Sequence, residues 1–184
     1  VIGNSVTSIG KEAFYQCAFK NITIPNSVRS IGEEAFKSCE KLVAISIPDS
    51  VTTIGDGIFT WCSSLERVEL PANIKEINSF MFYSCDSLKN FVIPKGVTSI
   101  GRRAFAFCQS LESVEIPNSV RSMGDLTFSH CSELNTIIFN GTMSEWDAIE
   151  KFENGSWTMV DGIIDWDYSA GEYRIWCTDG TIEK

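Results

Sequence analysis

The stretch Ile93–Cys108, I-P-K-G-V-T-S-I-G-R-R-A-F-A-F-C, contains the features that decide the fold of this chain. Its proline belongs to a series that returns every 23 residues, at Pro25, Pro48, Pro71, Pro94 and Pro117. Its cysteine belongs to a second series with nearly the same spacing, at Cys17, Cys39, Cys62, Cys85, Cys108 and Cys131. A fixed period of this length predicts one small structural unit, copied six times and stacked.

Each copy contains two apolar patterns that predict strands. Val114 and Ile116 lie two residues apart just before a proline, which is the spacing of a strand with one buried face. Proline ends this strand, because it cannot donate a ladder hydrogen bond. A second apolar pair then follows three residues apart, as at Val97 and Ile100. We expect this pair to form the second wall of each coil.

The rest of each copy predicts a corner and a helical turn. A glycine follows the second apolar pair at Gly10, Gly32, Gly55, Gly101 and Gly124, and Asn78 replaces it once. Because Gly and Asn adopt positive φ most readily, we expect a left-handed corner there. A phenylalanine lies three residues before each cysteine, as at Phe105 and Cys108, and this spacing is typical of one face of a helical turn. The unit is therefore predicted to be strand, turn, short strand and helical turn.

Composition and charge limit the classes of function. The chain has 184 residues, 43% of them hydrophobic, and a formal net charge of −9. Phosphate recognition requires clustered Lys and Arg, which the sequence lacks, so nucleic-acid binding is not expected and anionic membrane surfaces are disfavoured. No apolar run approaches the roughly 18 residues needed to span a bilayer, so membrane insertion is not expected.

Both ends of the repeat region carry information. The segment Ile2–Val6, I-G-N-S-V, already fits the later I-P-N-S-V segments, so we expect the chain to be a fragment or a processed product. Residues 1–140 hold 12 basic and 14 acidic side chains, whereas residues 141–184 hold 3 and 10. The latter segment also holds four of the five tryptophans. We therefore predict six repeats in residues 1–140 and a C-terminal cap in residues 141–184.

The predicted cap consists of a helix and a hairpin. Ser144–Phe152 is predicted to be a helix capped by Ser144, with Trp146, Ile149 and Phe152 on one face. The residues that alternate like strand residues are Ile163, Ile164, Trp166, Tyr173, Ile175 and Cys177. Thr178–Gly180, T-D-G, is predicted to be the hairpin turn.

The candidate chemical groups favour structural roles. One thiol per coil, with parallel Cβ vectors between neighbours, favours buried free thiols over disulfides or zinc ligands. His130 is the only histidine and is expected to face outward on the helical turn rather than to activate Cys131. Asp161, Asp165 and Asp167 lack the spacing of a calcium loop and favour a solvated acidic face. No catalytic residue, metal or cofactor is predicted.

Two sets of variable positions are candidate partner-binding residues. Aromatic side chains just before each cysteine are expected to face outward or into the groove between coils, where they either anchor a partner or pack neighbouring coils: Tyr15, Trp61, Tyr83, Phe107 and His130. The second set lies at outward strand positions, of which the candidates are Arg67, Glu69, Asn90, Val92 and Glu115. The strand set is small and mixed in character and shows no aromatic row.

The columns L-x-x-I-x-I-P-x-x-V-x-x-I-G-x-x-A-F-x-x-C resemble the BspA-type leucine-rich repeat over about 140 residues in six copies. The segments Phe139–Ile149, F-N-G-T-M-S-E-W-D-A-I, and Trp176–Ile182, W-C-T-D-G-T-I, are similar to the region that often closes such arrays. The resemblance implies an α/β repeat solenoid, a leucine-rich-repeat right-handed coil with short parallel strands and one helical turn per 23-residue repeat.

The resemblance also implies a function. Members of this family are typically surface-exposed or secreted and are implicated in adhesion, and no catalytic residues define them. We therefore expect an extracellular or cell-surface module that binds a host protein, glycan or neighbouring cell, with extracellular matrix among the candidate partners. The alternative is a structural spacer or assembly segment of a larger surface protein. An enzyme is the third hypothesis, disfavoured because one histidine and buried thiols cannot assemble a nucleophile, base and orienting group.

Overall fold

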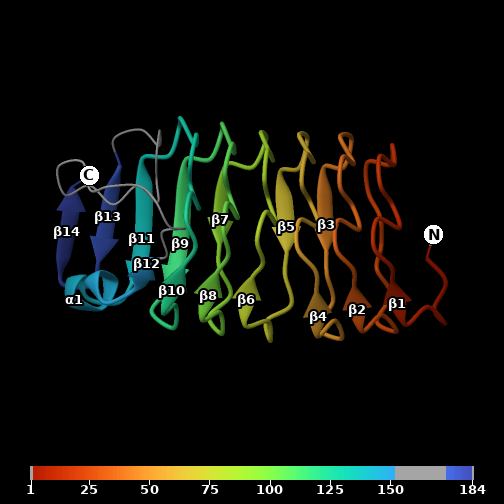
Figure 1. Cartoon of the computed structure of the whole chain (residues 1–184), viewed down its shortest axis with the longest axis horizontal. Helices are drawn as coiled ribbons and strands as arrows, with labels where there is room; N and C mark the ends of the chain where they lie inside the picture. The colour runs from red at the N-terminus through yellow and green to blue at the C-terminus, as the bar shows by residue number, and fades with distance from the viewer. Residues whose placement is uncertain (1, 152–172, 184) are drawn as a thin grey trace.

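The structure, a computed structural model, describes residues 2–151 and 173–183. Its coils stack along the long axis, with the N-terminal coil at one end and the C-terminal strands at the other (Figure 1). From residue 44 onward each coil contributes two strands, whereas the coils before it contribute one short strand each, and the strands of successive coils that pair do so in parallel. The parallel repeat solenoid predicted from the 23-residue period is confirmed.

One side of the solenoid carries the longer strands. They are β3 (Ala44–Ser46), β5 (Arg67–Glu69), β7 (Asn90–Val92), β9 (Ser113–Pro117), β11 (Thr136–Asn140), β13 (Arg174–Cys177) and β14 (Gly180–Glu183). They form a two-stranded sheet, β3-β5, and a five-stranded sheet, β7-β9-β11-β13-β14. Val114 is in register with Phe91 and Ile137, so these members of one apolar column form a row of buried side chains.

A second side carries the short strands. They are β1 (Ser8–Ile9), β2 (Ser30–Ile31), β4 (Thr53–Ile54), β6 (Glu76–Ile77), β8 (Ser99–Ile100), β10 (Ser122–Met123) and β12 (Glu150–Lys151). They form the sheets β1-β2-β4 and β6-β8-β10-β12, with a break between β4 and β6. Ile9, Ile31 and Ile54 stay in register across the first sheet and are buried.

Phenylalanine rings fill the centre of the stack. Neighbouring rings of the column stack with centroids 5.1–5.8 Å apart, in the order Phe14, Phe36, Phe59, Phe82, Phe105 and Phe128. All of these except Phe14 are fully buried. A single coil could not bury such a ring on both faces, so the core forms only through stacking.

The predicted helical turn is wrong. Residues 33–38 form successive turns, in which Lys37 N–H donates to the Glu34 carbonyl at 3.0 Å. Alternate amides instead reach the next coil: Glu34 N–H donates to Asp56 O at 2.8 Å and Phe36 N–H to Ile58 O at 3.0 Å. A helix would use both sets of amides internally, whereas this segment uses half of them to join the coils.

The left-handed corners also lie elsewhere than predicted. Positive φ occurs at two positions of every coil, five residues and one residue before the cysteine, as at Glu34 (φ 55°) and Ser38 (φ 58°). The glycine column has no positive φ. A Cβ on Gly101 would lie 2.4 Å from the backbone nitrogen of Ser79, so this glycine permits close approach of two coils.

The C-terminal segment confirms the hairpin and corrects the helix. Helix α1 spans Met143–Asp147, shorter than predicted, because the chain enters β12 at Glu150. Its cap is Thr142, not Ser144, and Thr142 forms a capping box with Glu145. Strands β13 and β14 pair antiparallel, and β13 continues the sheet beside β11. Phe152, Ile163, Ile164 and Trp166 lie outside the described residues, as do Asp161, Asp165 and Asp167.

Candidate binding surface

Three of the predicted aromatic residues form one row on the turn side of the coils. Tyr83 and Phe107 have ring centroids 5.2 Å apart, and Phe107 stacks on His130 at 4.3 Å with an interplanar angle of 12°. Phe80 extends the row, 5.9 Å from Tyr83. The row joins neighbouring coils, as the packing interpretation expects, and still reaches the surface, so the anchoring of a partner stays a prediction.

Backbone conformation explains why the side chain one residue before each cysteine faces outward. Trp61, Phe107 and His130 have φ of 61°, 62° and 61°, so each side chain diverges from the buried Phe and Cys beside it. His130 is exposed, as predicted, and its Nδ1 lies 2.7 Å from the Ser129 hydroxyl oxygen. Phe80 was missed by the sequence reasoning because positive φ at its column, five residues before the cysteine, is not visible in the amino-acid pattern.

Trp61 and Tyr15 remain apart from the aromatic row. Trp61 is 46% exposed, and the Lys37 ammonium lies 5.1 Å from its ring centroid. Lys37 also forms an ion pair with the Glu34 carboxylate at 2.7 Å, so the same ammonium contacts both this carboxylate and the indole ring. Tyr15 is exposed on the first coil.

The strand-face candidates lie where the alternation predicts. Arg67, Glu69, Asn90 and Val92 are exposed on β5 and β7, and Glu115 is half-buried on β9. The Glu115 carboxylate accepts a hydrogen bond of 2.8 Å from the Asn140 side chain. Arg67 has only Glu66 as an ion-pair partner among the described residues, at 3.6 Å.

An exposed apolar row on this strand face was not predicted. Val92 is in register with Glu115, Glu115 with Ile138, and Ile138 with Trp176. The three apolar side chains are 64%, 40% and 47% exposed in the order Val92, Ile138 and Trp176. The alternation of Tyr173, Ile175 and Cys177 was the available signal, because it places Trp176 on the opposite, outward face.

The cysteine column is buried, as predicted, and it also bonds neighbouring coils. The thiols of Cys39, Cys62, Cys85, Cys108 and Cys131 each donate to a phenylalanine carbonyl of the preceding coil, with sulfur–oxygen distances of 3.0–3.3 Å. Cys17 and Cys177 are half-buried. Within residues 2–151 and 173–183, His, Cys, Asp and Glu side chains form no group that could hold a metal ion.

Burial of these thiols predicts a loss of stability at alkaline pH. Burial raises the pKa of Cys39 from 9.0 to about 11 and that of Cys131 to about 12, and it raises the pKa of Cys85 well above its ordinary value. The folded state therefore holds these protons more tightly than the unfolded chain does. Their contribution to stability is complete below pH 9 and declines as pH rises from 9 toward 11.

The measurement is the urea-unfolding midpoint at several pH values for the wild type and for Cys85→Ala. The variant removes one buried thiol, so its midpoint should fall less between pH 9 and pH 11. Tyrosine and lysine ionise in both proteins, and the comparison cancels their effect. Equal declines in the two proteins would contradict the role of the thiol.

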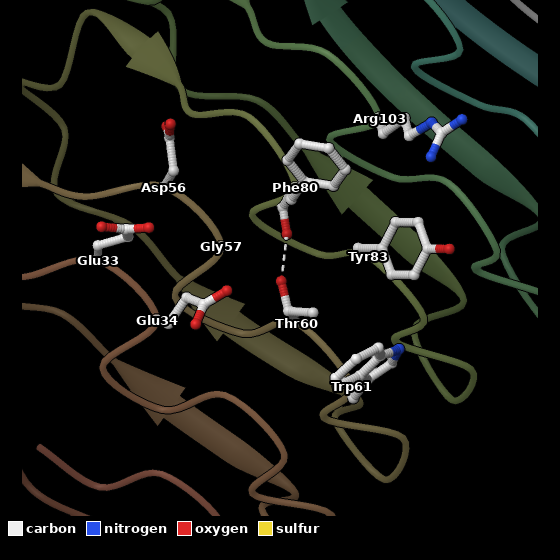
Figure 2. Close-up of a pocket in the computed structure, with 9 residues that line it drawn as sticks. All are labelled: Glu33, Glu34, Asp56, Gly57, Thr60, Trp61, Phe80, Tyr83 and Arg103. Carbon is white, nitrogen blue, oxygen red and sulfur yellow. Dashed lines mark hydrogen bonds between the residues drawn. The ribbon is translucent and has the colours of Figure 1, made fainter. Parts of the chain in front are cut away.

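A cleft opens on the turn side between the second and fourth coils (Figure 2). Its volume is about 380 Å³. Glu33, Glu34 and Asp56 lie on one side, and Trp61, Phe80 and Tyr83 on the other, with Gly57 and Thr60 between them. The Thr60 hydroxyl donates to the Phe80 carbonyl at 2.9 Å, which fixes the floor of the cleft.

Stacked parallel coils, each with the same apolar columns, define a leucine-rich-repeat solenoid. The family model of the BspA type leucine rich repeat region matches six copies in residues 1–112 and 75–156. The chain belongs to this family.

Solved structures support the assignment. A leucine-rich cell surface protein from Faecalibacterium prausnitzii is 39% identical over 74% of this chain and 36% of its own, with a TM-score of 0.72. A leucine-rich repeat protein from Bacteroides ovatus is 32% identical over 82% of this chain and 44% of its own, with a TM-score of 0.71. A leucine-rich repeat protein from T. pallidum is 34% identical over 73% of this chain and 66% of its own, with a TM-score of 0.67. The comparison with curated proteins gives no match.

The chain spans less than half the length of the first two solved proteins that it matches. Among the described residues, no helix has the length and the apolar character needed to cross a membrane.

Proposed function

We propose that this chain is a non-enzymatic binding module of a cell-surface or secreted protein. It uses its extended repeat surface to adhere to a host protein, a glycan or a neighbouring cell. Membership of the BspA-type family and the F. prausnitzii relative, which is described as a cell surface protein, support the location.

One observation carries the proposal: Val92, Ile138 and Trp176 are exposed on one continuous strand face. Covering large exposed apolar side chains with a partner lowers the free energy, and tryptophan is among the residues enriched at binding hot spots. Glu115 lies within the row and supplies a polar group that selects the orientation of a partner.

The experiment is a screen of purified protein at micromolar concentration against immobilised matrix proteins, mucin and glycans. The triple variant Val92→Thr, Ile138→Thr, Trp176→Thr has a β-branched side chain at all three strand positions, so the sheet should persist. We expect it to bind the matched partner at least about tenfold more weakly than the wild type.

Tyr15→Thr is the matched control, because it removes one exposed aromatic ring from a different side of the solenoid. It should bind like the wild type. If the wild type binds none of the immobilised molecules, the proposal that this chain mediates adhesion is wrong.

The alternative function is a spacer or assembly segment. The first coil has an apolar hollow of about 730 Å³, lined by Ile2, Val6, Phe14 and Phe19 among others, on which a similar coil could stack. A longer chain whose binding resides entirely in another domain would favour this alternative.

A further inference from the structure

The cleft on the turn side exists because one coil lacks a side chain that the others have. The column five residues before the cysteine contains Glu12, Glu34, Phe80, Arg103 and Leu126, and Gly57 in the third coil. All six residues have positive φ, so the backbone is the same with and without a side chain. Gly57 thus leaves a gap between Glu34 of the preceding coil and Phe80 of the following one.

The break in the short-strand sheet falls at the same coils. Gly101 N–H donates to Ile77 O at 2.7 Å and Gly55 N–H to Ile31 O at 2.9 Å. Among the described residues, no equivalent bond joins Asn78 N–H to Ile54 O, and β4 and β6 do not pair. Asn78 is the one non-glycine of its column, in which Gly55 and Gly101 have no room for a Cβ beside the backbone of the preceding coil.

Several polar groups at the cleft have no partner within the described part of the chain. They are the Asp56 carboxylate, the Trp61 indole N–H, the Tyr83 hydroxyl and the Arg103 guanidinium, none of which has a side-chain hydrogen bond or an ion pair there. Together they supply donors and acceptors around one hollow. The Trp61 and Tyr83 rings supply flat apolar surface beside them.

The charges at the cleft nearly cancel. Glu33 forms an ion pair with Lys11 at 2.9 Å, and Glu34 forms one with Lys37 at 2.7 Å. Asp56 and Arg103 remain and have opposite signs. Glu76 is the next acid, and burial, together with the Asp56 charge, raises its pKa. A strongly charged ligand therefore gains little here, whereas a neutral ligand rich in hydroxyl groups matches both the polar groups and the rings.

We infer that this cleft binds a neutral sugar residue of a glycan. The apolar C–H face of the sugar lies on the Trp61 or Tyr83 ring, whose negative face attracts it. Its hydroxyls donate to Asp56 and accept from Arg103 and from the Trp61 N–H. The Lys37 ammonium over the Trp61 ring holds the indole in place. This inference rests on the proposed function, because it names one ligand class and one site for adhesion.

The experiment uses the full chain on an array of oligosaccharides with neutral terminal hexoses or N-acetylhexosamines, beside sialylated and sulfated ones. The best neutral oligosaccharide is then titrated in solution. Gly57→Glu fills the gap with the side chain that the preceding coil has at this column, and we expect it to weaken binding at least about tenfold. Trp61→Ala should do the same, because it removes the exposed ring.

Gly57→Ala is the matched control. It carries the same backbone cost at φ 63°, and the atoms nearest to its Cβ are the Thr60 hydroxyl oxygen, at 3.0 Å, and the Glu34 Cγ, at 3.4 Å. Its affinity should stay within about threefold of the wild type. Equal thermal midpoints of Gly57→Ala and Gly57→Glu show that the glutamate acts by filling the cleft and not by unfolding the chain.

Three results would overturn the inference: no binding of any neutral oligosaccharide at millimolar concentration, binding confined to sialylated or sulfated oligosaccharides, or neutral binding that both Gly57→Glu and Trp61→Ala leave intact. Its failure is distinguishable from that of the proposed function. Loss of partner binding in the Val92, Ile138 and Trp176 triple variant, without any effect of Gly57→Glu, would retain adhesion and reject the sugar site.

Discussion

Replacing Gly101 with alanine is expected to lower the free energy of unfolding by about 3 kcal/mol or more. The new Cβ would lie 2.4 Å from the Ser79 nitrogen and 2.8 Å from the Asn78 carbonyl carbon. These are backbone atoms of the preceding coil, so no rotation of a side chain relieves the contact. Separating the coils would break the 2.7 Å hydrogen bond from Gly101 N–H to Ile77 O. Urea unfolding followed by circular dichroism measures the effect.

Gly10 provides the matched control in the same column. A Cβ on Gly10 meets nothing within 4 Å, and its φ is not positive. Gly10→Ala should therefore change the free energy of unfolding by no more than about 0.5 kcal/mol. Equal losses in the two variants would show that the column is needed for its backbone conformation and not for the approach of the coils.

The amino-acid pattern predicted the features of the fold that depend on which side chains are apolar. The pair Val114 and Ile116 placed a strand and its buried face, and the turn Thr178–Gly180 placed a hairpin. The pattern attributed the glycine column to positive φ, whereas these glycines permit the close approach of two coils. A sequence shows a residue type but not the distance to the neighbouring coil. The pattern predicted a helical turn before each cysteine because Phe and Cys three residues apart share one face of a helix. The observed turns bury the same two side chains, so this spacing does not distinguish them from a helix.

The candidate site was predicted less completely. Trp61 and Val92 were selected as outward residues, and both are exposed. The grouping of the candidate residues was not visible: the aromatic row extends to Phe80, whose column varies in character, and the cleft depends on the missing side chain of Gly57. An absent side chain gives no positive signal in a single sequence. It becomes informative only when the neighbouring coils show what the position otherwise holds.

Replacing Phe82 with alanine is expected to lower the free energy of unfolding by about 3–5 kcal/mol. The Phe82 ring is fully buried and contacts Phe59, Phe91 and Phe105, with centroids 5.8, 4.8 and 5.1 Å apart. The cavity would lie in the middle of the array, where each coil is stabilised only by its neighbours.

The unfolding curve of this variant should also change shape. The coils before and after Phe82 lose their coupling, so the single transition expected of the wild type should broaden or divide. Phe14→Ala is the control, because Phe14 belongs to the same column but is half-buried on the first coil and stacks with only one ring of that column, Phe36. Phe14→Ala should lower the free energy of unfolding by less than Phe82→Ala does, and its unfolding should remain a single transition. A single sharp transition in Phe82→Ala would mean that the coils are coupled mainly by their hydrogen-bonded ladders, including the amides of residues 33–38, and not by the stacked rings.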